Sequence, residues 1–175
     1  MRVLVTGAAG FIGYHLSALL LEEGFRVVGY DGMTDYYDVR IKQRRHQMLL
    51  QHPHFSCLEG MLEDFETLHA LALAEKPDVI VHLAAQAGVR YSLDNPKAYL
   101  DSNLNGFLNI LESCRHHPVE HLIYASSSSV YGANQHTPIT HLAATFAIKG
   151  GAIEQQLHSI AGDGLLGWFT VHHKR

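Results

Sequence analysis

The chain has 175 residues, of which 47% are hydrophobic and 17% are charged, and its formal net charge is -4. These values predict one globular domain with a sizeable core, and they exclude a disordered chain and a general nucleic-acid or membrane-surface binder. No segment reaches about 18 consecutive apolar residues, so a membrane-spanning helix is not expected. The two cysteines, Cys57 and Cys114, lie far apart, which favours reduced thiols and a cytoplasmic location. The 14 histidines show no recurrent ligand spacing, so no metal site is predicted.

The first part of the chain has the pattern of a strand, a glycine-rich turn, a helix and a second strand. Residues 2–6 form a β-branched run, and apolar residues then recur at helical spacing over residues 11–23. Gly24 is a natural end for this helix, and residues 25–30 give a second apolar strand that is followed by Asp31. The pattern therefore predicts a complete βαβ unit.

Strand and helix patterns continue to alternate along the chain. The stretch 34–52 is polar, basic and partly helical in pattern. The next predicted elements are a strand, a helix, a strand, a long helix and a strand, at residues 55–58, 65–75, 78–83, 96–115 and 121–125. Such alternation predicts a doubly wound parallel sheet of the Rossmann type with about six strands, which binds ligands beyond the carboxyl ends of its strands.

Three glycines, Gly7, Gly10 and Gly13, follow the first predicted strand at a spacing of three residues. Such glycines allow a tight turn, let backbone amides approach a pyrophosphate and let the helix pack closely on the strand. A purely structural turn is the alternative, but the strand before it, the helix after it and Asp31 favour a dinucleotide. Asp31 would accept hydrogen bonds from the adenosine ribose and repel a 2′-phosphate, so NAD is predicted rather than NADP. The basic residues that follow could hold a phosphate, but most of them are interpreted as a solvated face; they are Arg40, Lys42, Arg44 and Arg45.

Five motifs occur along the chain in a fixed order. They are TGAAGFIG, DYYD, HLAAQAGVRYS, DSNL and SSSSVYG, at residues 6–13, 35–38, 82–92, 101–104 and 126–132. Together they resemble the extended short-chain dehydrogenase/reductase family and, within it, the UDP-glucuronate 4-epimerases. The resemblance covers roughly residues 1–140. It implies NAD as cofactor, UDP-glucuronate or UDP-galacturonate as substrate, and a homodimer.

The resemblance also implies a mechanism. In the family, a tyrosine phenolate takes the proton of the sugar 4-hydroxyl while hydride passes from C4 to the nicotinamide, and the hydride then returns to the other face. A lysine four residues after the tyrosine lowers the pKa of the phenol, and a serine, here Ser127, hydrogen-bonds the same oxygen. Dehydratases of the family carry an Asp-Glu pair where Ser128 and Ser129 stand, so epimerisation is favoured over elimination of water.

Site residues follow from the turn, the acidic residue and the matched motifs together. Predicted cofactor contacts are Gly7, Gly10, Phe11, Ile12, Gly13, Asp31, Ala84, Ala85, Asn103, Ser126 and Tyr131. Predicted substrate contacts are Ser128 and Arg90. Arg90 is the basic residue of the loop after the fourth predicted strand, and its guanidinium could grip a sugar carboxylate bidentately. An exposed arginine at the end of a loop is the alternative.

The chain departs from the family pattern after Thr140. No tyrosine follows Tyr131, and Thr145, which cannot supply a phenolate, stands four residues before Lys149. We therefore expect one dinucleotide-binding domain over residues 1–175, divergent over 141–175, with the C-terminal substrate domain absent. Met61 stands where the family often has an aspartate near the adenine. Two hypotheses remain open: a nucleotide-sugar epimerase lineage, and a non-catalytic NAD-binding fragment with little or no epimerase activity.

Overall fold

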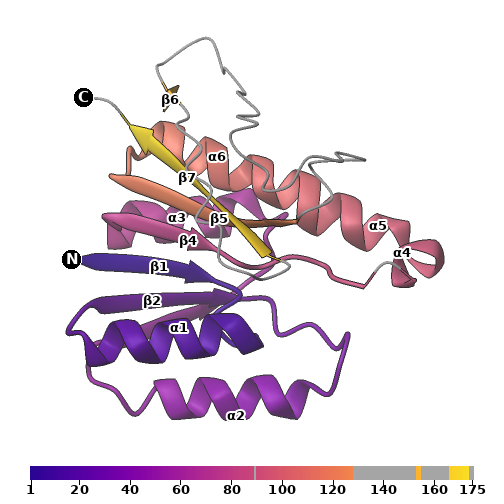
Figure 1. Ribbon diagram of the computed structural model, residues 1–175, viewed down its shortest axis with the longest axis horizontal. Coiled ribbons are helices and arrows are strands. Elements are labelled where there is room, and N and C mark those ends of the chain that lie inside the picture. Colours follow the sequence, from indigo (N-terminus) through magenta and orange to yellow (C-terminus); the bar gives the residue numbers. More distant parts are fainter. Residues whose placement is uncertain (89, 128–152, 155–165, 174–175) are drawn as a thin grey trace, which may run out of the picture.

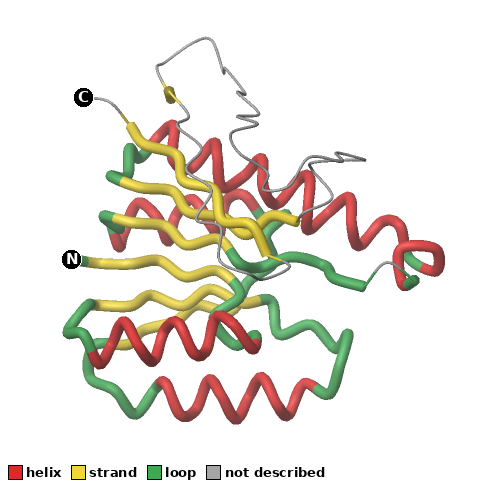
Figure 2. The backbone as a smooth tube through the Cα atoms, in the orientation of Figure 1, coloured by secondary structure: helices red, strands yellow, loops and turns green. Residues whose placement is uncertain are grey.

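The computed structural model describes residues 1–88, 90–127, 153–154 and 166–173, and it contains a sheet covered by helices (Figures 1 and 2). The strands are β1 Arg2–Thr6, β2 Arg26–Asp31, β3 Phe55–Glu59, β4 Val79–His82, β5 His121–Ser127, β6 Ile153–Glu154 and β7 Leu166–His173. The helices are α1 Phe11–Glu22, α2 Val39–Leu49, α3 Phe65–Glu75, α4 Tyr91–Asp94, α5 Pro96–Tyr99, the π-helix η1 Leu100–Asn105, and α6 Gly106–His116.

The strands lie in the order β3-β2-β1-β4-β5-β7-β6. The pairs β1–β2, β2–β3, β1–β4 and β4–β5 are all parallel, which confirms the predicted doubly wound parallel sheet. At one edge the sheet also has an antiparallel part that the sequence did not predict, because β7 pairs antiparallel with β5 and β6 pairs antiparallel with β7. Hydrophobic periodicity reports which faces of a strand are buried, and it carries no information on the direction of the strand.

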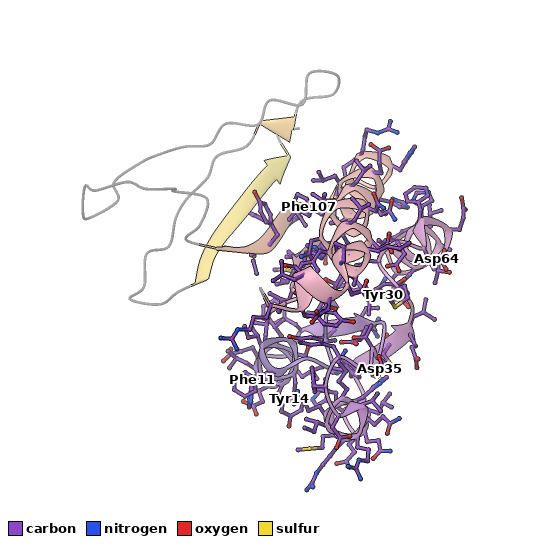
Figure 3. The ribbon with its side chains drawn as sticks, turned by 90° about the vertical axis from the view of Figure 1, so that its right-hand side faces the viewer. Phe11, Tyr14, Tyr30, Asp35, Asp64 and Phe107 are labelled. Carbon is purple, nitrogen blue, oxygen red and sulfur yellow. The ribbon has the colours of Figure 1, made fainter. Side chains whose placement is uncertain are left out.

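Two hydrophobic clusters cover the two faces of the sheet. In β1, Val3 and Val5 belong to the cluster that includes Leu21 of α1 and Leu49 of α2, whereas Leu4 belongs to the opposite cluster. The alternation follows from the period of two in a strand. In Figure 3, Phe11 and Tyr14 lie with α1, away from Phe107 of α6 and from Asp64 at the start of α3. Burial on both faces explains why β1 and β4 are nearly continuous apolar runs.

The helices differ in how their N-termini are capped. Asp38 accepts a hydrogen bond from the amide of Arg40 at the start of α2, and Asp64 accepts one from Thr67 at the start of α3. The N-cap of α1 is Gly10, which has no side chain and makes no side-chain cap. The first-turn amides of α1 therefore remain directed at the space in front of the helix, with the positive end of its dipole.

The long helix predicted for residues 96–115 is interrupted in the structure. It consists of α5, then η1 in the π conformation, then α6. Helical spacing of apolar residues does not distinguish a π turn from an α turn, because one extra residue shifts the pattern only slightly. π turns inside helices occur often at functional sites. Among the described residues, no helix is both long enough and apolar enough to cross a bilayer.

Candidate functional site

Two adjoining cavities lie beyond the carboxyl ends of β1, β2 and β4. The first has a volume of about 380 Å³ and the second about 720 Å³. Both are lined by the turn after β1 and the loop after β4, through Gly7, Gly10, Phe11, Leu83, Ala84 and Ala85. The cavities therefore meet across the glycine turn, at the edge where a doubly wound sheet binds ligands.

The glycine turn is packed so closely that side chains are excluded. Gly7 has a φ of +72°, and a Cβ there would lie 2.9 Å from the amide nitrogen of Ala84. A Cβ on Gly10 would lie 3.0 Å from the carbonyl oxygen of Gly7, and one on Gly13 would overlap the same oxygen. Close packing alone thus explains why glycine is required at positions 7 and 13. Gly10 adds an uncapped helix terminus that faces both cavities, which is the arrangement that holds phosphate in other dinucleotide folds.

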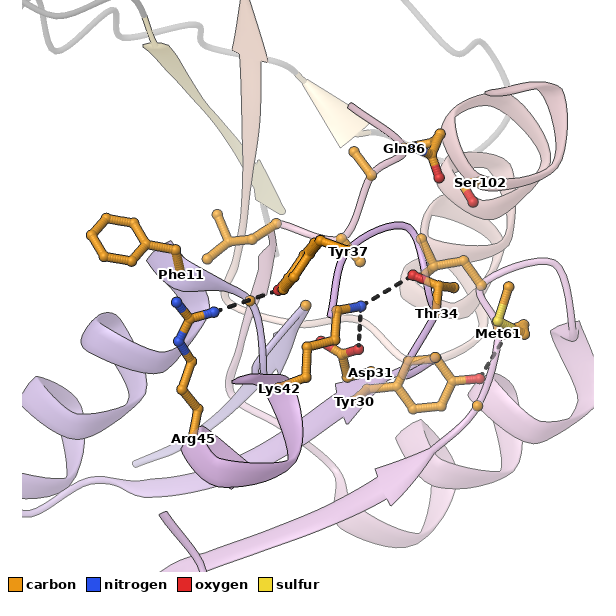
Figure 4. A pocket seen from close by; sticks show the side chains of 18 of the residues that line it. Phe11, Tyr30, Asp31, Thr34, Tyr37, Lys42, Arg45, Met61, Gln86 and Ser102 are labelled. Carbon is orange, nitrogen blue, oxygen red and sulfur yellow. Dashed lines mark hydrogen bonds and ion pairs between the residues drawn. The ribbon is translucent and has the colours of Figure 1, made fainter. Parts of the chain in front are cut away.

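Asp31, at the end of β2, lines the first cavity and is almost fully buried. Its Oδ2 accepts from the amide of Ala9 at 3.0 Å, and its Oδ1 accepts from the amide of Met33 at 2.9 Å. Lys42 forms an ion pair with Oδ1 at 3.3 Å and also donates to the hydroxyl of Thr34 (Figure 4). A carboxylate has about four acceptor positions, so these bonds leave Oδ2 able to accept a hydroxyl.

Lys42 is an exception to the solvated basic face predicted for most of these residues. Only 7% of the residue is exposed, and it reaches Asp31 from α2 across the first cavity. Its ammonium also lies 5.4 Å from the centre of the Tyr37 ring. The sequence pattern predicts a polar helix at these residues. It does not show that α2 packs beside α1 or that the Lys42 side chain is buried. Arg40, by contrast, is exposed and pairs with Asp38, as a solvated face predicts.

Arg45 also lines the first cavity. Its Nη1 lies 3.4 Å from the hydroxyl of Tyr37 and 3.5 Å from the carbonyl oxygen of Ala9. Its guanidinium carbon lies 5.6 Å from the centre of the Phe11 ring. Figure 4 shows the guanidinium between these two aromatic side chains.

A buried hydrogen-bond network joins the ends of β1 and β4, and sequence reasoning missed it. The Oγ1 of Thr6 accepts from the amides of Leu83 at 3.1 Å and Ala84 at 3.2 Å, and it lies 2.8 Å from Nδ1 of His82. Since the threonine oxygen already accepts twice, its own proton is directed at Nδ1. Burial lowers the pKa of His82 to about 4, so the ring is neutral near pH 7. The network fixes the loop that both cavities share.

Asn103 holds the same loop from the other side. Its Oδ1 accepts from the amide of Gln86 at 2.8 Å, and its Nδ2 donates to the carbonyl of Gln86 at 3.0 Å. Asn103 lies within η1, so the π turn brings this amide to the loop. Asn103 lines the second cavity, as do Ile12 and Gly13. The structure therefore shows Asn103 binding the protein backbone beside the predicted cofactor space.

The remaining predicted residues lie at the end of β5, in the loop before α4 or beyond the described ranges. Ser126 and Ser127 end β5, where their backbones pair with Gly167 and Leu166 of β7. Arg90 is exposed just before α4 and is absent from the described lining of either cavity. The other predicted or discussed positions lie outside the described residues; they are Ser128, Tyr131, Thr145 and Lys149. Where the structure describes the chain, no group of three or more metal-ligating side chains comes together.

Met61 and Tyr30 also line the first cavity. The Tyr30 hydroxyl donates to the Met61 carbonyl at 2.9 Å, and burial together with nearby Asp64 and Glu63 raises the pKa of Tyr30 to about 12. Tyr30 is therefore a structural donor and no substitute for a catalytic phenolate. Met61 presents an apolar side chain to the cavity where the family pattern often has a carboxylate.

Comparisons with known proteins identify the family to which the chain belongs. The model of a family described as GDP-mannose 4,6 dehydratase matches residues 4–147. A probable UDP-glucuronate 4-epimerase of Rhizobium meliloti is 54% identical over 138 residues, which are 79% of this chain and 40% of that protein. UDP-glucuronate 4-epimerase 4 of Arabidopsis thaliana is 42% identical over 184 residues, covering 98% of this chain and 42% of that protein. The chain thus spans about two fifths of the length of these curated relatives.

Solved structures show the same fold in related enzymes. UDP-glucuronic acid 4-epimerase of Bacillus cereus, in complex with UDP-glucuronic acid and NAD, superposes with a TM-score of 0.70 and 35% identity, covering 78% of this chain and 43% of that one. UDP-glucose 4-epimerase of Stenotrophomonas maltophila with bound NAD gives a TM-score of 0.69 and 32% identity, covering 85% and 43%. Because the family model matches most of the chain, the chain belongs to the GDP-mannose 4,6 dehydratase family, a group of NAD-dependent epimerases and dehydratases within the extended short-chain dehydrogenases/reductases.

Proposed function

We propose that this chain is the dinucleotide-binding part of an NAD-dependent nucleotide-sugar 4-epimerase. The observation that carries the proposal is the pair of cavities that meet across the glycine turn, with Asp31 on the wall of the first. The adenosine half of NAD would occupy the first cavity and the nicotinamide half the second. The relatives named as UDP-glucuronate 4-epimerases support this choice within the family.

The residues present fit a dinucleotide. The uncapped terminus of α1 supplies amides for the diphosphate, and a Cβ on Gly7 would close the space between the turn and the β4 loop. Asp31 keeps one acceptor position for a ribose hydroxyl. Bound NAD would supply a hydride acceptor and donor for C4 of the sugar. The chain's own contribution is to position that cofactor, with the loop after β4 held by Thr6 and Asn103.

The proposed sugar site rests on family likeness and on fewer residues. Ser127 would hydrogen-bond the 4-hydroxyl, Ser128 would assist it, and Arg90 would bind the carboxylate of UDP-glucuronate or UDP-galacturonate. The sequence offers no tyrosine after Tyr131 to act as base. Loss of a general base costs about a hundred- to ten-thousand-fold in rate, so this 175-residue chain should show little or no epimerisation. A non-catalytic NAD-binding protein is the alternative function that this missing phenol favours.

Two measurements on the purified chain test the proposal. Calorimetric titration with NAD should show binding, and Gly10→Glu should abolish it, because a carboxylate would enter the space of the diphosphate. Leu93→Ala, a change at an exposed residue away from both cavities, serves as the matched control. Equal NAD affinity in Gly10→Glu would refute the cofactor site. Turnover of UDP-glucuronate with NAD at an ordinary enzymatic rate would instead refute the missing-base argument and the non-catalytic alternative.

We also propose that the chain forms a homodimer in the cytoplasm. Leu100, Leu104 and Leu108 recur every four residues along η1 and α6, and their exposed fractions are 49%, 64% and 56%. An apolar stripe of this kind on a helix surface favours association with another protein surface. The cytoplasmic location is supported by Cys57 and Cys114, which are both free thiols.

A further inference from the structure

The first cavity has an unbalanced charge. Its charged lining residues are Asp31, Lys42 and Arg45. Asp31 and Lys42 form a buried ion pair and compensate each other, with 9% of each side chain exposed. Arg45 is the charge that remains, so the described wall of this cavity carries a net positive charge near neutral pH.

The contacts of Arg45 are with neutral groups. Its Nη1 has two long hydrogen bonds, at 3.4 Å to the Tyr37 hydroxyl and 3.5 Å to the Ala9 carbonyl. Among the described residues no carboxylate lies within ion-pair distance of its guanidinium, in contrast to Arg40 and Arg115, which pair with Asp38 and Glu112. A guanidinium offers five donors, and most of them are not used by these two bonds. The side chain is thus placed by neutral contacts and keeps its capacity to bind an anion.

The position of Arg45 coincides with the anion-binding end of α1. Ala9, whose carbonyl it contacts, directly precedes the N-cap Gly10, and Phe11, over whose ring it lies, is the first residue of α1. Figure 4 shows the guanidinium beside Phe11. A phosphate bound to the amides of the first turn would therefore lie near this planar group of donors.

We infer that Arg45 is a phosphate-binding residue that grips the diphosphate of the dinucleotide from α2, opposite the amides of α1. The inference rests on the proposed NAD site. The two cations of α2 that line the cavity then have different roles. Lys42 compensates the negative charge of Asp31, and Arg45 compensates the negative charge of the diphosphate. Phe11 and Tyr37 hold the guanidinium from either side, so little side-chain freedom is lost when it binds. The diphosphate is then held by neutral amides on one side and by a formal charge on the other.

The test is calorimetric titration of NAD into the wild-type chain and into Arg45→Gln, Arg45→Lys and the control Arg44→Gln, each at low and high salt. Arg44 is the adjacent exposed arginine of the same helix, outside the described lining of the cavity. We expect Arg45→Gln to weaken NAD binding about tenfold or more at low salt, because a charge-assisted contact is lost. Arg45→Lys should recover part of the loss, and Arg44→Gln should bind as the wild type does.

Salt separates a charge contact from packing. The affinity of the wild type should fall as salt is raised, and the difference between wild type and Arg45→Gln should shrink, because salt screens partly exposed charges. A loss in Arg45→Gln that is equal at all salt concentrations, or no loss at all, would overturn the inference. Failure of the wild type itself to bind NAD would instead overturn the proposed function. Circular dichroism and the urea midpoint of each variant show that it is folded, and Arg45→Met replaces Arg45→Gln if that variant is not.

Discussion

Stability of the fold should depend on pH through His82, which lies at the end of β4. Burial lowers the pKa of this ring from 6.5 to about 4, and its Nδ1 faces a threonine hydroxyl whose proton is already directed at it. Protonation would place two hydrogens between Nδ1 and Thr6 Oγ1, and it would also put a charge into the core. The network can therefore form only with the neutral ring.

The sign of the effect follows from proton uptake. Between pH 6.5 and about 4 the unfolded chain binds a proton at His82 that the folded chain does not, so the free energy of unfolding rises with pH. The contribution is fully present above pH 6.5 and is lost as the pH falls toward 4. The gap between the two pKa values corresponds to about 3 kcal/mol. That is a large part of the stability of an ordinary domain.

Urea unfolding of the wild type and of His82→Gln, measured from pH 7.5 down to about 4 where two-state behaviour holds, isolates this contribution. Glutamine can accept a hydrogen bond from the Thr6 hydroxyl and does not titrate. The pH profile of the variant therefore reports the contributions of all titratable groups other than His82. The wild type should be the more stable protein at neutral pH, and its advantage should shrink by about 3 kcal/mol as the pH falls. Parallel pH profiles for the two proteins would refute the argument.

Three further changes have expected outcomes. Gly13→Ala should lower the free energy of unfolding by about 1–3 kcal/mol in urea titration, since its Cβ would overlap the Gly7 carbonyl oxygen; an unchanged midpoint would contradict this packing. Lys42→Met should cost about 3 kcal/mol, because Asp31 would stay buried without its cation, and the double variant that combines Lys42→Met with Asp31→Leu should cost less than the sum of the two single changes. Strict additivity in that cycle would show that the pair does not interact. Leu104→Glu should shift the chain toward monomer in sedimentation velocity, whereas an unchanged sedimentation coefficient would show that the stripe of Leu100, Leu104 and Leu108 is not the interface.

The order of elements along the parallel part of the sheet was accessible from sequence because its signals are local. The strand at residues 2–6, the helix at 65–75 and the end of α1 near Gly24 follow from hydrophobic spacing and from residues that break helices. The glycine turn and Asp31 were accessible for the same reason, since they lie within one βαβ unit. Asp31 does line the first cavity, although its role toward a ribose remains a prediction.

Features that depend on long-range packing were not accessible. Lys42 and Arg45 were grouped with Arg40 because all three lie on one polar helix, and only the placement of α2 beside α1 separates them. The link between Thr6 and His82 joins residues that are 76 positions apart. The hydrogen bonds between Asn103 of η1 and the Gln86 backbone join residues that are 17 positions apart. None of these contacts leaves a periodic signal in the sequence.

The central position of β1 also has a consequence for synthesis on the ribosome. β1 is made before β2 and β4, so it can pair with β2 early, but its other edge must wait for β4. The register partners Thr6 and His82 are separated by 76 residues, so at about 5–20 residues per second this edge stays open for roughly 4 to 15 seconds. During that interval the apolar residues Val3 and Val5 lie on an unpaired strand edge, which is the kind of surface that recruits other chains. A nascent chain is thus most prone to aggregation before residues 79–82 emerge, and chaperone contact would protect it most in that window.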